Sequence, residues 1–348
     1  MDPKGKINFF RRRITRFFTK SIVLSSKEES LINIDLTQVK KILIVRPNHR
    51  LGNTLLLTPL IKDVSNIFPY AEIHLFLMGS LGEVVFENNK YVTKIIRLPR
   101  KPFKNLLIYF ESWFSLFKEK YDISINANHI SSSGKIAVKL SDSNYKFYNH
   151  FNENISHYSD YNHNAKNPIY NFRFVIRKKM KFVLNKNIPL LEINLREYEI
   201  ENGKKIIDSL FNNNKPVISI FTYATGDKCL SQDWWYLFYN KLNQKFTSFN
   251  ILEILPIENI SSINFSARTF YSKDIREIAS VMSQSIIFIG ADSGMMHLAS
   301  SSPITTIGLF KSTNPELYGV YGNNSVSVDT NTLNNDNIID LINNKLNN

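Results

Sequence analysis

The segment with the most chemical information runs from an apolar stretch through a glycine into the start of a helix. It reads Gly290-Ala-Asp292-Ser293-Gly294-Met295-Met296-His297. Asp292 is suited to cap the helix, while Ser293 and Gly294 present backbone N–H groups and the positive end of the helix dipole. His297 follows one turn later and can donate to a phosphate or ribose oxygen. The pattern predicts an anion-binding site, and the alternative is an ordinary cap with a partly buried histidine.

A second group of polar residues follows the first apolar stretch of the chain. It reads Arg46-Pro47-Asn48-His49-Arg50-Leu51-Gly52-Asn53. Arg46 and Arg50 suit bidentate recognition of phosphate or carboxylate groups on an acidic acceptor, unless both simply face solvent. A histidine such as His49 titrates near neutral pH and can act as a general base, although a single loop histidine is more often a bystander.

Both groups stand at the ends of short apolar runs, which indicates that strands position them. In the first half, the runs alternate with helical periodicity and predict a parallel sheet with crossover helices. A stretch rich in Asn, Tyr, His and Ser, residues 141–167, has no periodicity and predicts a long loop. The other predicted elements are strands at 42–45, 71–77, 93–98 and 122–125, and helices at 55–67, 103–117 and 172–184.

The second half repeats this alternation, so we expect a second open parallel sheet. Ligands of such sheets bind at the carboxyl ends of the strands. The fold class expected is therefore α/β, with two Rossmann-like domains facing across a cleft. We assign residues 1–40 to a basic amphipathic leader, residues 41–185 to the first domain and residues 186–348 to the second domain. The predicted elements are strands at 216–222, 250–255, 286–289 and 304–309, and helices at 234–246, 275–282, 294–299 and 338–346.

Several stretches of the chain form one combined pattern. The motif Asp292-Ser293-Gly294-x-x-His297-Leu-Ala is followed by Pro303-Ile-Thr-Thr-Ile-Gly308 and by a loop that begins Asn314-Pro315-Glu316. Upstream, Thr222-Tyr-Ala-Thr225-Gly-Asp-Lys228 precedes a predicted helix that contains Trp234 and Trp235. Together these stretches resemble the signature of glycosyltransferase family 9, the ADP-heptose:lipopolysaccharide heptosyltransferases. The resemblance covers about residues 41–324 and implies the two-domain architecture called GT-B, with the nucleotide sugar bound to the second domain.

Carried over to matching positions, the resemblance assigns donor-binding roles to Thr225, Lys228 and Glu258. It assigns the same role to five residues of the signature: Asp292, Ser293, Gly294, Met295 and His297. The Lys228 ammonium would neutralise a diphosphate oxygen, and Glu258 would bind the ribose hydroxyls. A fixed cation with aligned N–H dipoles stabilises the charge that builds on a departing nucleoside diphosphate. No Asp-x-Asp pair is present to hold a divalent ion, so we expect neither a metal nor another cofactor.

The first half departs from the family at one important position. Family members carry a Ser-Leu-Gly-Asp turn after the first strand, and its aspartate is assigned as the general base. Asn53 occupies that position here, in a loop one residue longer. An amide can orient an acceptor hydroxyl but cannot deprotonate it. The base is then His49, a group near His129 or the substrate's own phosphate, or else the activity is weak or absent.

Composition excludes several other classes. No run of eighteen apolar residues occurs, and the single Cys229 cannot form an internal disulfide, which fits a cytoplasmic protein without a spanning helix. The net charge of +13 favours anionic partners. Part of it lies in residues 1–25, where arginines and lysines alternate with phenylalanines; this favours an amphipathic segment on an anionic membrane surface, or a basic leader that packs on the first domain.

Three functions remain. The leading one is inverting, metal-independent transfer of a sugar, a heptose by resemblance, from a nucleoside diphosphate to a lipopolysaccharide core or related anionic glycolipid. The second is a sugar-nucleotide binder that has lost turnover because of Asn53. The third, a nucleic-acid-binding protein, would explain the charge, but no stacking, helix-turn-helix or zinc motif accompanies it, so no nucleic acid is expected.

Overall fold

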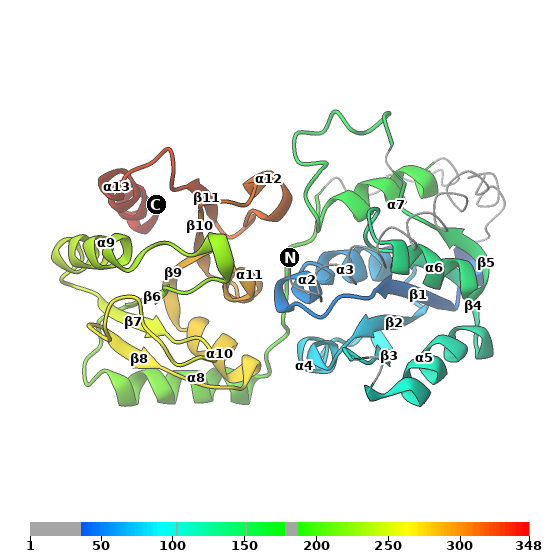
Figure 1. The fold of residues 1–348 in the computed structure, drawn as a ribbon, viewed down its shortest axis with the longest axis horizontal. Helices are drawn as coiled ribbons and strands as arrows, with labels where there is room; N and C mark the ends of the chain where they lie inside the picture. Colours follow the sequence, from blue (N-terminus) through cyan, green and yellow to red (C-terminus); the bar gives the residue numbers. More distant parts are fainter. Residues whose placement is uncertain (1–35, 102–103, 151, 178–186, 348) are drawn as a thin grey trace. The chain divides into compact units, whose positions relative to one another are not determined.

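The structure, a computed structural model, describes residues 36–101, 104–150, 152–177 and 187–347. The described residues divide into two compact units. Unit 1 comprises the described residues of 36–49, 59–83 and 90–189, and unit 2 comprises residues 50–58, 84–89 and 190–347. Each unit is built on one parallel sheet with helices around it (Figure 1), which confirms the expected α/β class.

The sheet of unit 1 has five parallel strands in the order β3-β2-β1-β4-β5. The central strand β1 is a run of aliphatic residues, and burial on both faces suits such a run to the middle of a parallel sheet. The strands are β1 (Lys41–Arg46), β2 (Glu72–Met78), β3 (Val92–Leu98), β4 (Lys120–Asn126) and β5 (Asp142–Phe147). The helical elements in this part of the chain are η2 (Leu36–Gln38), α3 (Thr58–Ile67), α4 (Leu81–Val85), α5 (Leu106–Lys118), α6 (Ser132–Leu140) and α7 (Asn167–Arg177).

Helices cover both faces of this sheet. On one face, Leu43 and Val45 of β1 pack with Leu116 of α5 and with Ala137 and Val138 of α6. On the other, the ring of Phe172 from α7 packs against Phe68 after α3 and Phe147 of β5. The predicted strands of the first half and the helix at 103–117 are therefore confirmed, with boundaries shifted by up to three residues.

The prediction of a loop over 141–167 was partly wrong, because its first residues form β5. This strand pairs with β4 alone, so it is an edge strand, and only Phe147 among its six residues is buried. An edge strand of this kind has no apolar run to reveal it. The predicted helix at 172–184 is confirmed as far as Arg177, where α7 ends; residues 178–186 lie outside the described part of the chain.

The sheet of unit 2 has six parallel strands in the order β11-β10-β9-β6-β7-β8. They are β6 (Val217–Phe221), β7 (Asn250–Ile254), β8 (Arg268–Phe270), β9 (Ser285–Ala291), β10 (Thr305–Phe310) and β11 (Val326–Asp329). The helical elements are α2 (Leu51–Leu55), α8 (Glu197–Leu210), η4 (Gly226–Lys228), α9 (Gln232–Lys245), α10 (Ile275–Met282), α11 (Gly294–Ser301), α12 (Pro315–Tyr318) and α13 (Asn335–Asn347). All predicted elements of this half are present.

One face of the second sheet packs on α9 and α13. The largest buried side chain there is Trp235 of α9, which joins Phe238, isoleucines of β6, β9 and β10, and Ile338 of α13 in one apolar cluster. The opposite face carries α10 and α11, and α8 lies against α10; Figure 1 shows α8 with α10 and α9 with α13 as separate pairs. This packing holds β6 and β9 in place. The loops that follow these two strands contain the candidate site.

Candidate active site

The candidate site of unit 2 lies where the strand order reverses. Successive strands run outward from β6 in one direction and from β9 in the other, and β6 and β9 are neighbours. The loops that leave these two strands diverge, and an open α/β sheet binds ligands at such a point. The loop after β6 contains Thr225 and Lys228, and the loop after β9 contains Asp292 and Ser293. The two strongest sequence motifs therefore meet.

The amino terminus of α11 is capped by Ser293, which corrects the prediction that Asp292 is the cap. The Ser293 hydroxyl accepts a hydrogen bond from the backbone N–H of Met296 at 3.3 Å. Asp292 still belongs to the sheet, because its N–H donates to the Leu309 carbonyl at 2.9 Å. Ser293, Gly294 and Met295 remain partly exposed, so the positive end of the helix is available to an anion.

Lys228 is held at this helix end by Asp292. Its Nζ donates to Asp292 Oδ2 at 2.5 Å, and the carboxylate is 4% exposed while the lysine side chain is 32% exposed. The ammonium also lies 5.8 Å from the ring centroid of Tyr318 in α12. A buried carboxylate thus fixes the position of a cation whose remaining N–H donors can reach a ligand. The sequence predicted Lys228 and Asp292 as site residues, but it predicted neither the pairing of the two nor the contact with Tyr318.

A second lysine, Lys311, lies at the same loop and was missed by the sequence analysis. It follows β10 directly, and its Nζ donates to the Cys229 carbonyl at 2.8 Å. Lys311 and Thr225 are both exposed, and Gly226 adopts a φ of +64°, which glycine tolerates without strain. The only sequence signal for Lys311 was its position at a strand end, which is too common to single out a residue.

Glu258 lies in the loop after β7, beside the loop after β6. Its Oε1 accepts a long hydrogen bond of 3.5 Å from the hydroxyl of Tyr223, and the glutamate is exposed. Partial desolvation of the Tyr223 hydroxyl, with a smaller contribution from the Glu258 charge, raises the pKa of this tyrosine. The pair stands at the carboxyl ends of neighbouring strands, where a hydroxyl-bearing ligand group can be bound.

A fully buried carboxyl group lies below this loop. Glu253 of β7 accepts hydrogen bonds from the hydroxyls of Thr222 and Ser261, both at 2.7 Å. Burial raises the pKa of Glu253, and the two hydroxyl donors partly oppose that shift. The glutamate sits in an otherwise apolar strand, so sequence periodicity treated it as a core position and gave no hint of this network.

Helix α2 packs on the first turn of α11 within unit 2. A Cβ at Gly52 would lie 2.6 Å from Cδ2 of His297, and a Cβ at Gly294 would lie 3.1 Å from that of Leu51. His297 is 4% exposed, so its ring packs against α2. Asn53, the residue at the expected base position, is half-buried in this same short helix, and Arg50 is its exposed N-cap residue. The structure therefore brings Asn53, Gly294 and His297 into one pair of helices.

Arg46 and His49 belong to unit 1. Arg46 is 3% exposed at the end of β1, and its Nη1 donates to the Ala127 carbonyl at 3.3 Å after β4. The strand order of this sheet reverses between β1 and β4, so Arg46 lies at the switch point of unit 1. Its side chain is buried and does not face solvent. His49 is exposed, close to Gly79 and the side chain of Arg100.

His129, the other region considered for a base, follows β4 in unit 1. Burial lowers the pKa of this histidine, as does the nearby charge of Lys135, while a hydrogen bond with Asn167 opposes the shift. A histidine with a lowered pKa is neutral at physiological pH and can accept a proton.

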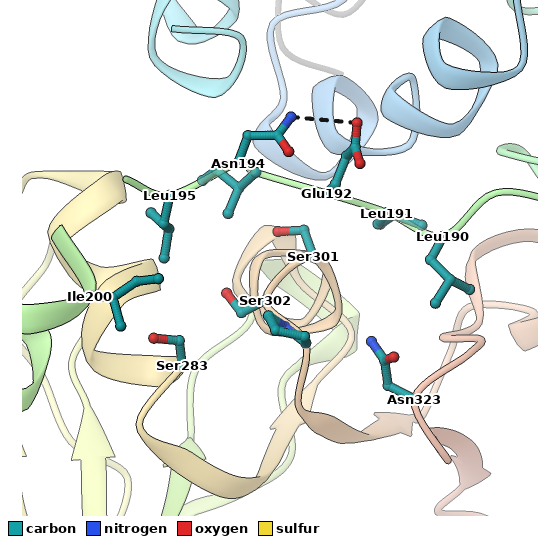
Figure 2. Close-up of a pocket in the computed structure, with 12 residues that line it drawn as sticks. Leu190, Leu191, Glu192, Asn194, Leu195, Ile200, Ser283, Ser301, Ser302 and Asn323 are labelled. Carbon is teal, nitrogen blue, oxygen red and sulfur yellow. Dashed lines mark hydrogen bonds between the residues drawn. The ribbon is translucent and has the colours of Figure 1, made fainter. Parts of the chain in front are cut away.

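A separate pocket of about 430 Å³ lies in unit 2, at the other end of α11 (Figure 2). The extended segment 190–195 forms one wall, and Ser283, Ser301 and Ser302 at the carboxyl ends of α10 and α11 form another. Figure 2 shows Glu192 and Asn194 pointing away from these serines, with the Asn194 amide donating to Glu192 at 3.4 Å. None of the predicted site residues lines this pocket.

Within the described ranges, no group of three or more His, Cys, Asp or Glu side chains could hold a metal ion. Within the same ranges, no helix is long and apolar enough to cross a membrane. The amphipathic leader predicted for residues 1–25 lies outside the described residues.

The match to a protein-family profile falls on the segment that contains part of the candidate site. The sequence profile of glycosyltransferase family 9 (heptosyltransferase) matches residues 269–339, which include β9, α11 and β10. A search of curated protein sequences found no match.

Solved structures share the fold of nearly the whole chain. A family 9 glycosyl transferase from Veillonella parvula is 16% identical with a TM-score of 0.71, over 90% of this chain and 98% of that chain. E. coli heptosyltransferase WaaC with ADP is 15% identical with a TM-score of 0.65, over 88% and 99%. E. coli ADP-heptose lps heptosyltransferase II is 11% identical with a TM-score of 0.63, over 88% and 98%. The family 9 profile therefore covers the segment that contains the candidate site, and the solved structures show that nearly the whole chain has the fold of these enzymes.

Proposed function

We propose that this chain transfers a heptose from ADP-heptose to a lipopolysaccharide core or related anionic glycolipid, by an inverting and metal-independent reaction. The observation that carries the proposal is the placement of Lys228, held by buried Asp292, beside the exposed amino terminus of α11 at the switch point of unit 2. E. coli WaaC, which shares the fold, was solved with ADP and also with ADP-2-deoxy-2-fluoro heptose. These ligands support an adenosine diphosphate sugar as the donor.

In this proposal the diphosphate binds to the N–H groups of Gly294 and Met295 and to the Lys228 ammonium. As the bond from the anomeric carbon to the diphosphate breaks, negative charge accumulates on the departing oxygen, so fixed N–H dipoles and a cation stabilise the transition state more than the ground state. Asp292 keeps the ammonium in place between turnovers, which reduces the reorganisation that binding requires. Thr225, at the exposed start of the same loop, adds a hydroxyl donor.

The nucleoside and the acceptor engage other residues. Glu258, next to the Tyr223 hydroxyl, is positioned to bind ribose hydroxyls. Arg50 is exposed and suits an acidic acceptor, whereas the burial of Arg46 favours a role in fixing the strand ends of unit 1. The burial of His297 likewise favours support of the first helical turn through α2 over direct contact with the donor.

The general base of the reaction must be a group other than Asn53. Asn53 cannot remove a proton, although its amide can orient the attacking hydroxyl. Two histidines are candidates: His49 is exposed, and His129 is held neutral by its lowered pKa. If neither histidine acts as the base, the chain has the alternative function, that of a nucleotide-sugar-binding protein with little or no turnover. We place the reaction at the cytoplasmic face of an anionic membrane, with residues 1–25 as one contact.

The test is a transfer assay with radiolabelled ADP-heptose and a lipopolysaccharide-core acceptor, in the presence of EDTA. We expect a product whose new linkage is inverted, as judged by NMR, and a turnover that Lys228→Ala reduces by about a hundredfold. Lys241→Ala is the matched control, because Lys241 also pairs with a carboxylate, that of Asp336, on α9 away from the site. Loss of turnover in EDTA would contradict metal independence, and tight donor binding without any transfer would support the alternative.

A further inference from the structure

The outer face of α5 is an unusually apolar surface. Six of its thirteen residues are large apolar side chains that are between 47% and 86% exposed: Leu106, Leu107, Ile108, Phe110, Phe114 and Phe117. All but Ile108 fall within an arc of roughly 100° around the helix, since each residue advances by about 100°. Figure 1 shows α5 at the periphery of unit 1. Soluble surfaces rarely concentrate this many exposed apolar side chains without a partner.

The inner face of the same helix already accounts for its packing on the sheet. Ser112 and Leu116 are buried, and Tyr109 and Trp113 pack against the core of unit 1. The Ser112 hydroxyl donates to the carbonyls of Arg97 and Ile108 at 2.8 and 2.7 Å. The outer residues therefore contribute little to holding α5 in place, so their exposure calls for another explanation.

Cations stand at both ends of this apolar face. Arg100, Lys101 and Lys104 precede α5, Lys118 ends it and Lys120 follows, and all five are exposed. None of them forms an ion pair with a carboxylate within the described residues, whereas the acidic Glu119 is already occupied by Lys41 and Lys94. The charge that opposes these cations on the helix itself is Glu111 alone.

We propose that the outer face of α5 docks on the surface of an anionic lipid bilayer. Its phenylalanines and leucines would enter the boundary between headgroups and acyl chains, and the flanking cations would bind anionic headgroups. A second copy of the chain fits less well, because a twofold interface through α5 would bring two sets of unpaired cations together. The inference is independent of the transfer reaction, since α5 belongs to unit 1 and the residues proposed to bind the donor belong to unit 2.

The experiment is cosedimentation of the full chain with vesicles of phosphatidylcholine alone or mixed equally with phosphatidylglycerol. We expect binding to the anionic vesicles, and a loss of about tenfold or more in the partition coefficient for the variant L107S/F110S/F114S. The matched control is Y70S/Y236S/L237S, whose three positions are also exposed, at 94%, 48% and 57%. It should bind like the wild type.

The leader must be separated from α5 in this test, so both variants are also made in a chain carrying R11A/R12A/R13A. A tenfold loss in either background supports the proposal. Unchanged partitioning of L107S/F110S/F114S in both backgrounds overturns it, as does equal binding to vesicles without phosphatidylglycerol. If sedimentation equilibrium instead shows a wild-type dimer that this variant converts to a monomer, with vesicle binding intact, the face binds a second copy.

Discussion

At the scale of single residues, the pairing of Lys228 with Asp292 is the central feature of unit 2. A lysine ammonium is a compact, strongly hydrated charge, and a free loop lysine would lose considerable entropy on binding a phosphate. The buried Asp292 carboxylate holds Nζ at 2.5 Å and reduces that loss. The sequence predicted Asp292 as a helix cap and, through the resemblance, Lys228 as a phosphate-binding residue. It did not predict their pairing, because a contact between residues 64 positions apart leaves no local pattern.

Glu253 supplies a prediction about pH. Burial raises its pKa above the ordinary value of 4.5, so the folded chain holds this proton more tightly than the unfolded chain does. The stabilisation from protonated Glu253 is complete below about pH 4.5 and is lost as the pH rises through the raised value. Glu253→Gln removes that dependence while an amide still fits between two hydroxyls. In thermal melts, the variant should gain Tm relative to the wild type as the pH increases from about 4 to about 8. A constant difference would show that the carboxyl is not buried as described.

At the scale of elements, the contact between α2 and α11 connects a first-half motif to the signature helix. Replacing a helical glycine by alanine ordinarily stabilises a helix by about 0.5–1 kcal/mol. Gly52→Ala should instead cost about 1–3 kcal/mol, because the new methyl would lie 2.6 Å from the ring of His297. Urea unfolding measures the cost. His297→Ala should open the space, so the double variant should recover most of the loss; additive effects would contradict the packing.

Arg276 in α10 connects two other chain segments of unit 2 to this helix. It is 5% exposed; it donates to Glu199 Oε1 and Oε2 at 2.6 and 2.7 Å and also to the carbonyls of Val84, Ile193 and Asn194. Removing one partner of a buried, hydrogen-bonded ion pair costs about 3–5 kcal/mol, so Arg276→Met should lower the free energy of unfolding by that amount. Arg268→Met, at an exposed position of β8, should stay within about 0.5 kcal/mol of the wild type. Equal effects of the two variants would contradict this role.

The elements also show where sequence reasoning succeeds. Central strands such as β1 and β9 were predicted because burial on both faces requires a continuous apolar run. The edge strands β5 and β11 and the polar helix α8 were missed, since half-exposed elements carry mixed sequences. Arg276 was missed for the opposite reason: a buried arginine looks like a surface residue in a linear pattern.

At the scale of the whole molecule, two parallel sheets of five and six strands reproduce the expected class, and the site was found because strand order determines which loops diverge. The sequence could place the signature at the end of a strand, and the resemblance supplied Lys228. The sequence could not place Lys311 or Tyr318, because these residues lie near the site only as a result of the order of the strands in the sheet. The positive net charge of +13 would raise the encounter rate with anionic substrates without selecting among them.

The most direct test of the account is the affinity for ADP and for AMP, measured by isothermal titration calorimetry at one ionic strength. If the diphosphate binds between Lys228 and the amino terminus of α11, ADP should bind the wild type at least about tenfold more tightly than AMP, a difference of about 1.4 kcal/mol. Lys228→Ala should remove most of that difference, and Lys241→Ala should leave it intact. Equal affinities of ADP for the wild type and Lys228→Ala would contradict the proposed site.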